Sequence, residues 1–93
     1  MRFVWHEEKN RQNLAKHGVS FELAALVFDD PLQRSLPDPR GDEERWQTMG
    51  CVGGVLILMV VHTIKEEEDE EEVRIISARK ATRRERRAYE EGQ

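Results

Sequence analysis

The longest apolar run in the chain is Val55–Val61 (VLILMVV), in which every position is hydrophobic. Because successive side chains of a strand point to opposite faces of a sheet, this run predicts a central strand that is covered on both sides. It follows Gly53-Gly54, a pair that suits a two-residue hairpin turn, and Arg45–Val52 is the expected partner strand. The pattern therefore predicts an antiparallel hairpin at the centre of the fold.

A helical pattern precedes this hairpin. Apolar residues after Ser20 recur at i, i+3, i+4 and i+7, the spacing of one helix face: Phe21, Ala24, Ala25 and Phe28. Ser20 is a suitable N-cap, and Asp29-Asp30-Pro31 ends the pattern. We expect this apolar face to lie in the core.

The N-terminal segment predicts a short strand followed by another helix. Arg2–Trp5 alternates with the period of two that is typical of a strand. Glu7–His17 is predicted to be helical and to end at Gly18, because glycine readily adopts the left-handed conformation that closes a helix.

The other elements are shorter or less regular. Leu32–Leu36 is predicted to be a strand and Pro37–Asp42 a loop. The acidic run Glu66–Glu72 is expected to be a solvated hairpin loop, because runs of like charge tend to stay disordered. Val73–Ser77 is the expected last strand, and a helix should run from Ala78 to about Glu90.

These elements form the order strand, helix, helix, three or four antiparallel strands, helix, which predicts an α+β fold. The 93 residues fit one domain, residues 1–93. The lone cysteine, Cys51, cannot form an internal disulfide, which fits a reducing cytoplasm. The chain begins without an apolar signal segment, and its longest apolar run is far shorter than a membrane span. We therefore expect a cytoplasmic protein.

Charge is distributed unevenly along the chain, although the net charge is only −4. Residues 65–72 carry one lysine against seven acids, whereas Val73–Tyr89 has seven basic residues among its seventeen. In a helix Arg79, Arg83 and Arg87 would share one face, because they are four residues apart. Such a face either binds phosphate or is simply solvated, and both interpretations stay open at this point.

The sequence offers little support for metal or cofactor chemistry. A metal site needs several His, Cys or carboxylate ligands at fixed spacing, whereas His6, His17 and His62 are scattered. The acidic run lacks the spacing of a calcium loop, and no glycine-rich phosphate loop joins a strand to a helix. We expect no cofactor and no metal.

The basic residues suit the chemistry of RNA cleavage. The 2′-hydroxyl of RNA can attack the adjacent phosphate, so an enzyme must align that attack, neutralise the phosphorane and move two protons. One guanidinium group can donate two parallel hydrogen bonds to two oxygens of a phosphate. His62 or His17 could move protons, because histidine titrates near neutrality. In a regular hairpin, however, His62 lies closer to Arg74 than to Arg79, and Arg45 could be its neighbour. The grouping of His62 with Arg79 therefore stays open.

Four segments of the chain match a known family: FVWHEEKNRQNLAKHGVSFELAALVF, ERWQTMG, VVHT and RIISARKATRRERRAYE. With them the chain resembles the BrnT toxins of bacterial type II toxin–antitoxin systems, which belong to the RelE-like ribonuclease superfamily. The resemblance implies a RelE-like α+β fold with two N-terminal helices, an antiparallel sheet of about four strands and a C-terminal helix. It also implies metal-independent cleavage of RNA that arrests growth.

The resemblance also implies partners. The cognate antitoxin would be of the BrnA type, which occludes the toxin and carries the DNA-binding part of the complex. Operator DNA would be bound only through this complex, which represses its own operon. A homodimer within the complex is one assembly that would fit, and no membrane is involved.

Site residues are carried over by position. The resemblance places Arg79 and Arg83 in the active site, with Lys80, His62 and Arg45 as further candidates. Four N-terminal residues also match the family pattern, and they either shape the site or hold the first helix in place: Lys9, Asn13, Lys16 and His17.

Two departures from the family pattern leave an alternative function open. His6 stands where many relatives have Asp as the helix cap, and the seven acids of Glu66–Glu72 could compete with RNA for the arginines. The alternative is a catalytically weak or inactive homologue that binds the antitoxin as a co-repressor. A basic helix that binds DNA alone is less favoured, because the chain is net acidic and lacks a helix-turn-helix signal.

Overall fold

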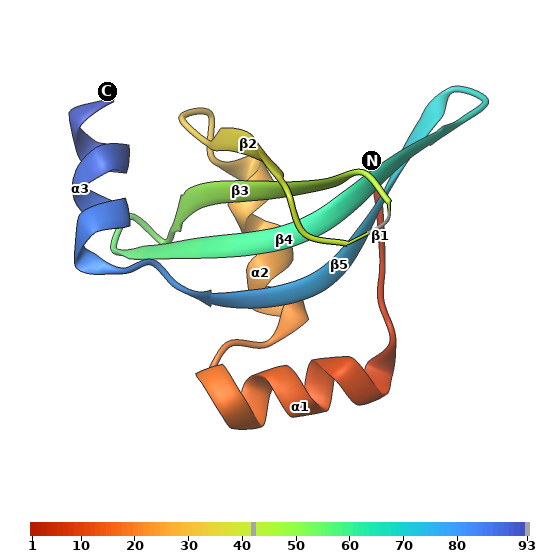
Figure 1. The fold of residues 1–93 in the computed structure, drawn as a ribbon, viewed down its shortest axis with the longest axis horizontal. Coiled ribbons are helices and arrows are strands. Elements are labelled where there is room, and N and C mark those ends of the chain that lie inside the picture. Colours follow the sequence, from red (N-terminus) through yellow and green to blue (C-terminus); the bar gives the residue numbers. More distant parts are fainter. Residues whose placement is uncertain (42, 93) are drawn as a thin grey trace.

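The computed structural model describes residues 1–41 and 43–92. Its elements follow this order: β1 (Arg2–Val4), α1 (Glu7–His17), α2 (Phe21–Ala25), the 3-10 helix η1 (Leu26–Asp29), β2 (Arg34–Asp38), β3 (Arg45–Val52), β4 (Leu56–Glu67), β5 (Glu70–Lys80) and α3 (Arg83–Glu91). Figure 1 shows the strands as one twisted sheet with α1 and α2 on one side, while α3 stands at one end. No helix among the described residues is long and apolar enough to cross a membrane.

The strands form a mixed sheet in the order β1-β5-β4-β3-β2. The predicted α+β class is confirmed, but the described sheet has five strands instead of about four. It is also not wholly antiparallel, because β1 pairs in parallel with β5, with Phe3 opposite Val73. β1 can pair in parallel because α1 and α2 form a long connection between it and the rest of the sheet.

The predicted central hairpin is formed by β3 and β4. Their pairing runs from Trp46 opposite His62 to Val52 opposite Leu56. The turn between the strands has three residues, 53–55, and not the predicted two, because Val52 pairs with Leu56 and β4 starts at Leu56 instead of Val55. Gly53 and Gly54 in this turn both have positive φ, 65° and 74°, which glycine adopts without strain. Residues 57–62 of β4 are all buried, so the continuous apolar run is the central strand that its pattern predicted.

The prediction of a loop over the acidic run Glu66–Glu72 was wrong. β4 and β5 stay paired to Glu67 opposite Glu70, and the turn is confined to Glu68 and Asp69. Figure 1 shows this part as a ribbon that projects from the sheet. The pairing places two glutamates opposite each other twice, which costs energy. An ion pair of Lys65 with Glu67 (2.9 Å), and one of Arg2 with Glu72, offset part of this repulsion.

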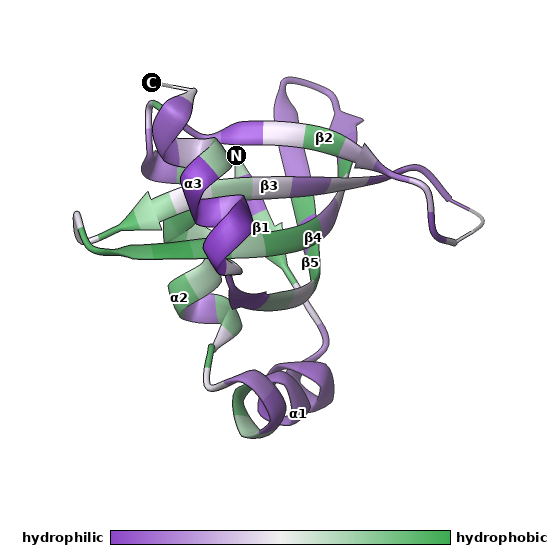
Figure 2. Cartoon of the chain, turned by 60° about the vertical axis from the view of Figure 1, so that its left-hand side comes forward, coloured by the Kyte–Doolittle hydropathy of each residue, from purple (hydrophilic) through white to green (hydrophobic). Residues whose placement is uncertain are grey.

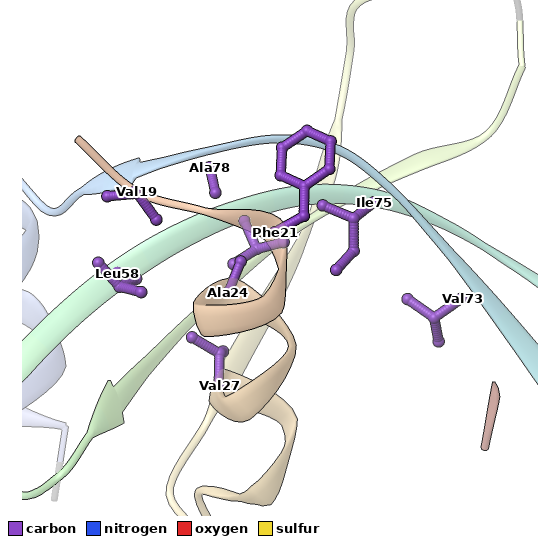
Figure 3. Packing of buried hydrophobic residues seen from close by; sticks show 9 residues of the cluster. Val19, Phe21, Ala24, Val27, Leu58, Val73, Ile75 and Ala78 are labelled. Carbon is purple, nitrogen blue, oxygen red and sulfur yellow. The ribbon is translucent and has the colours of Figure 1, made fainter. Parts of the chain in front are cut away.

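The core lies between the sheet and the α1–α2 side. Figure 3 shows the α2 region packed against β4 and β5, and the fully buried members include Phe21, Ala24, Val27, Leu58 and Ile75. The predicted N-cap is confirmed, since the hydroxyl of Ser20 accepts a hydrogen bond from the Leu23 N–H (3.0 Å). The predicted single helix is divided into α2 and η1. Figure 2 shows that α1 and α3 are mostly hydrophilic, so the core depends on the strands and α2.

The predicted boundary between the last strand and the last helix was also wrong. β5 continues to Lys80, because Ala78 pairs with Val60 and Arg79 with Met59, and this pairing overrides helix propensity. The helix starts only after Thr82, whose hydroxyl accepts the Glu85 N–H (3.1 Å) while the Glu85 carboxylate accepts the Thr82 N–H (2.9 Å). This capping box shows that Arg79 cannot share a helix face with Arg83 and Arg87.

A β-bulge lies in the middle of β5. Val61 is opposite Ser77, whereas His62 is opposite Ile75, so Ile76 is an extra residue on β5. Val73 and Ile75 before the bulge, and Ala78 after it, are all buried in the core.

The edge strand β2 lies next to the helix α3, and Arg34 of β2 donates to the carbonyl of Ala88 in α3. β2 includes Pro37, which was predicted to be in a loop, and an edge strand tolerates proline because one of its sides has no ladder partner. Asp42, the end of that predicted loop, lies outside the described residues. Tyr89 is buried, and its hydroxyl donates to the carboxylate of Asp30. Burial and this hydrogen bond raise the pKa of Tyr89 to about 12, so the phenol remains a neutral donor.

Candidate functional site

The two faces of the sheet differ in what covers them. Cross-strand partners share a face, so the buried row Thr48, Val60 and Ala78 belongs with the core under α1 and α2. We call this the closed face. The alternate residues form the open face, with one row of Met49, Met59 and Arg79 and a neighbouring row of Gln47, Val61 and Ser77.

A hollow of about 330 Å³ lies on the open face. Its polar lining comes from the end of α1, the segment after β2, and strands β3 and β5: Lys16, His17, Arg40, Gln47, Ser77 and Arg79. Met59 and Val61 provide apolar lining. Because these side chains include a lysine, two arginines and a histidine, we call it the basic hollow.

Arg79 is fixed in position by Glu85. Its two terminal nitrogens donate to the two carboxylate oxygens of Glu85, at 2.7 and 2.9 Å, and one of them also donates to the carbonyl of Lys80 (3.3 Å). This bidentate contact with Arg79 is the main reason why the pKa of Glu85 falls to about 2. The pair therefore stays charged near neutral pH. The side chain of Arg79 is still 40% exposed, so it can also contact a ligand.

Asn13 positions the end of α1 beside Arg79. Its amide donates to the carbonyls of Val19 and Ala78, both at 2.8 Å, and it accepts the Ala78 N–H at 3.2 Å. Asn13 is buried, and these contacts join α1 directly to β5. As a result, Lys16 and His17 lie at the basic hollow. Lys9, which also matched the family pattern, is exposed on α1 and does not line the hollow.

Arg40 is held by the buried carboxylate of Asp38. The carboxylate accepts from the Arg40 side chain at 3.1 and 3.3 Å and from its backbone N–H at 3.1 Å. These bonds lower the pKa of Asp38, and the nearby side chain of Gln47 adds to the effect. The positions of Arg40 and Gln47 are therefore coupled through one ionised group.

His62 lies on the closed face, away from the basic hollow. Only 1% of it is exposed, its Nε2 lies 2.6 Å from the hydroxyl of Thr48, and its ring packs edge-on against Phe28 at 4.9 Å. Burial lowers the pKa of His62, so the neutral form is favoured. The expectation that His62 lies nearer Arg74 than Arg79 is confirmed, because Thr63 next to it pairs with Arg74.

The structure does not bring the other predicted residues to the basic hollow. Arg45 pairs with Asp38 at the start of β3, two residues from Gln47 and on the same face, but it does not line the hollow. Its Nε is buried without a hydrogen-bond partner among the described residues. Lys80 is exposed at the end of β5, and Arg83 is exposed in the first turn of α3. Of the five active-site candidates Arg79 alone lines the hollow, together with Lys16 and His17 of the N-terminal group.

Three residues of the hollow were missed in the sequence. Gln47 and Ser77 occur in predicted strands, and their pairing with the neighbouring strand would have placed them on the face opposite the core. Arg40 lies in a segment rich in proline and glycine, where no periodicity shows the direction of a side chain. Thr82 and Glu85 carried a capping-box signal that would have separated Arg79 from the helix.

Within residues 1–41 and 43–92 no three His, Cys, Asp or Glu side chains gather as they would to hold a metal ion. This statement concerns side-chain placement alone, so metal independence stays a prediction.

Comparisons with known proteins identify the family. A family model described as "Ribonuclease toxin, BrnT, of type II toxin-antitoxin system" matches residues 5–85. The crystal structure of the Brucella abortus ribonuclease toxin BrnT matches with a TM-score of 0.62 and 31% sequence identity, covering 89% of this chain and 99% of that one. No sequence among the curated proteins matches. The chain belongs to the BrnT family of ribonuclease toxins of type II toxin–antitoxin systems.

Proposed function

We propose that this chain is a metal-independent endoribonuclease that holds the scissile phosphate of RNA in the basic hollow. The observation that supports this most is the clamped guanidinium of Arg79, with Lys16, His17 and Arg40 lining the same hollow. Glu85 and Asp38 hold two of these cations before any ligand binds, which reduces the entropy lost on binding.

In the proposed step, the ribose 2′-oxygen forms a bond to phosphorus while the bond from phosphorus to the 5′-oxygen breaks. The products are a 2′,3′-cyclic phosphate and a 5′-hydroxyl. Negative charge grows on the phosphorane oxygens, and Arg79 and Arg40 stabilise it because the cations are already oriented. His17 accepts the proton of the 2′-hydroxyl, and the ammonium of Lys16 donates a proton to the leaving 5′-oxygen.

The remaining predicted residues receive different roles. Lys80 and Arg83 are exposed and follow Arg79 by one and four residues in the sequence. We propose that they contact phosphates further along the RNA. His62 is buried in the core, and we infer that it contributes to stability. We assign Arg45 to the support of the loop before β3, since its guanidinium lies near Gly41 and Glu43.

We also propose that a BrnA-like antitoxin neutralises the chain by covering the basic hollow. The family is defined by toxin–antitoxin pairs, and an uncovered cationic hollow would bind cellular RNA. The antitoxin would carry the DNA-binding part, so operator DNA would be bound through the complex, within which two toxin chains could pair.

The test is cleavage of RNA by the purified chain, with and without a chelator. We expect equal cleavage in both, and 2′,3′-cyclic phosphate ends at the cut sites. A double variant, Arg79→Ala with Arg83→Ala, should relieve growth arrest in cells that lack the antitoxin. Loss of cleavage in the chelator would contradict the metal-free mechanism, and full toxicity of the double variant would contradict the site.

One observation favours the alternative, an inactive homologue that acts as a co-repressor. Glu85 holds both terminal nitrogens of Arg79, and a phosphate would have to share or displace this contact. If the purified chain never cleaves RNA but shifts operator DNA together with its antitoxin, the co-repressor function is the correct one.

A further inference from the structure

A second hollow, also of about 330 Å³, lies beside the basic hollow on the open face. It is lined by β2, β3, β4 and the end of α3: Arg34, Leu36, Gln47, Met49, Met59 and Ala88. Gln47 and Met59 line both hollows, so the two adjoin each other. We call this second hollow the methionine hollow.

We propose that the methionine hollow binds the nucleobase next to the scissile phosphate and so sets the base preference of cleavage. This inference rests on the proposed function of the basic hollow, and it adds a recognition subsite for one base of single-stranded RNA. Specific recognition of RNA commonly relies on unstacked bases that stack on side chains and expose their edges.

The register of the sheet gives the hollow the right position. Arg79, Met59, Met49 and Arg34 are successive cross-strand partners on β5, β4, β3 and β2. Neighbouring strands are about 4.8 Å apart, so Met59 and Met49 lie one and two strand spacings from Arg79. If Arg79 binds the scissile phosphate, the base of the nucleotide that carries this phosphate would therefore lie over Met59 and Met49.

The chemistry of the lining suits a planar base. Met49 and Met59 are 8% and 7% exposed, because they pack with Ile57 and Tyr89, and only their outer surface lines the floor of the hollow. Polarisable thioethers make favourable contacts with aromatic rings. Leu36 and Ala88 add apolar walls. Arg34 donates to the carbonyl of Ala88 (3.0 Å), which fixes a planar guanidinium at the far side, where it can stack on the ring.

Gln47 supplies the polar group that can read the edge of the base. Its amide carries both donors and an acceptor, and it lies near enough to the ionised carboxylate of Asp38 to help lower the pKa of that group. The same carboxylate binds Arg40, so the amide that reads the base is positioned together with a cation of the basic hollow. A volume of about 330 Å³ is at the small end for ligand pockets, which fits a ring system better than a helix of a partner protein.

The first experiment measures binding without cleavage. The probes are 2′-O-methyl RNA trinucleotides, which lack the attacking hydroxyl, with each of the four bases or an abasic residue in the centre. The chain has three methionines, and Met1 is 60% exposed outside the hollow, so its methyl NMR signal is an internal control. We expect the methyl signals of Met49 and Met59 to shift with at least one base, and the abasic probe to bind at least fivefold more weakly without these shifts.

Equal shifts with the abasic and the intact probes would overturn the proposal. So would RNA binding that leaves both methionine signals unchanged, or shifts that occur only with the antitoxin, which would make the hollow a protein-docking site. Because the probes cannot be cleaved, a chain without ribonuclease activity still gives a clear result.

The second experiment maps cut sites in a random-sequence RNA pool. Gln47→Leu keeps the size of the side chain but removes its hydrogen bonds, so we expect cleavage at preferred sites to fall at least fivefold and the base preference to flatten. The matched control, Gln12→Leu, makes the same change on the exposed surface of α1 and should keep the preference. An unchanged preference in Gln47→Leu, or an equal loss at every site, would overturn the role of Gln47 in base recognition. If the wild type cuts RNA independently of Arg79, the proposed function fails instead.

Discussion

The closed and open faces of the sheet are built from alternate residues of the same strands, yet they have different consequences. On the closed face Thr48, Val60 and Ala78 are buried with the apolar core under α1 and α2. On the open face Gln47, Ser77 and Arg79 line the basic hollow, which α3 leaves uncovered. Because neighbouring residues of one strand lie on different faces, we expect that stability and the proposed activity can be changed separately in this small domain.

The largest expected effect is on the closed face. Phe21→Ala removes a fully buried ring and should lower the free energy of unfolding by about 3–5 kcal/mol. Urea unfolding would measure this loss, and below the lowered melting temperature RNA cleavage should persist. As a control, Val55→Ala at an 85% exposed position should change stability by less than about 0.5 kcal/mol. A loss from Phe21→Ala no larger than the control's would contradict the packing described for this face.

The next effect is on the open face and concerns activity. Arg79→Ala should reduce the rate of RNA cleavage by about 100-fold or more, as expected when one preorganised charge is removed from a site. Single-turnover cleavage assays would measure this, with thermal unfolding to verify the fold. Arg84→Ala, an exposed arginine on α3, is the control and should change the rate less than about twofold. A similar loss in both variants would mean that net charge, and not the hollow, determines activity.

A smaller effect tests the clamp on Arg79. Glu85→Gln keeps an oxygen for the Thr82 N–H but removes the charge that fixes Arg79, so cleavage should fall about tenfold. The same assay would measure the change, and circular dichroism would show whether α3 remains helical. A rise in activity would instead indicate that Glu85 competes with RNA for Arg79.

The smallest effect is a dependence of stability on pH. Burial lowers the pKa of His62, so above the unfolded value, about 6.5, neither state binds the proton. Below it the unfolded chain binds more protons, and the free energy of unfolding falls with decreasing pH by up to about 1.4 kcal/mol per unit. Urea unfolding between pH 7 and 5 should therefore be less pH-dependent in His62→Gln, whereas His6→Gln on the surface should keep the slope. Equal slopes in all three proteins would exclude His62 as the source.

The sequence was informative where one physical effect dominates. The apolar run of β4 and the stripe around Phe21 determined the central hairpin and the packed helix, because burial controls both. It was misleading where two effects compete. Like charges predicted a loop after Lys65, but backbone pairing continues through them, and helix propensity predicted a helix at Arg79, but pairing with Met59 keeps it in β5.

The candidate site could be predicted only in part for a related reason. The family resemblance placed Arg79 in the site, and the sequence pattern placed it on a helix face that does not exist; it lines the hollow because of its place in a strand. His62 suits proton transfer by its residue type, but it is buried because residue 62 points to the closed face of the sheet. Gln47 and Arg40 join the site through contacts with Asp38, which are visible only in three dimensions.

The bulge in β5 determines which face of the sheet Arg79 points to. In a regular strand Ile75 and Arg79, four residues apart, have the same parity and would point to the same face, so an arginine would be buried in the core. The extra residue Ile76 changes the count by one, which keeps Ile75 and Ala78 inside and turns Arg79 out to the hollow. Removing Ile76 would leave Ile75 and Arg79 three positions apart, an odd number, so a regular strand would still keep Ile75 inside and Arg79 on the open face.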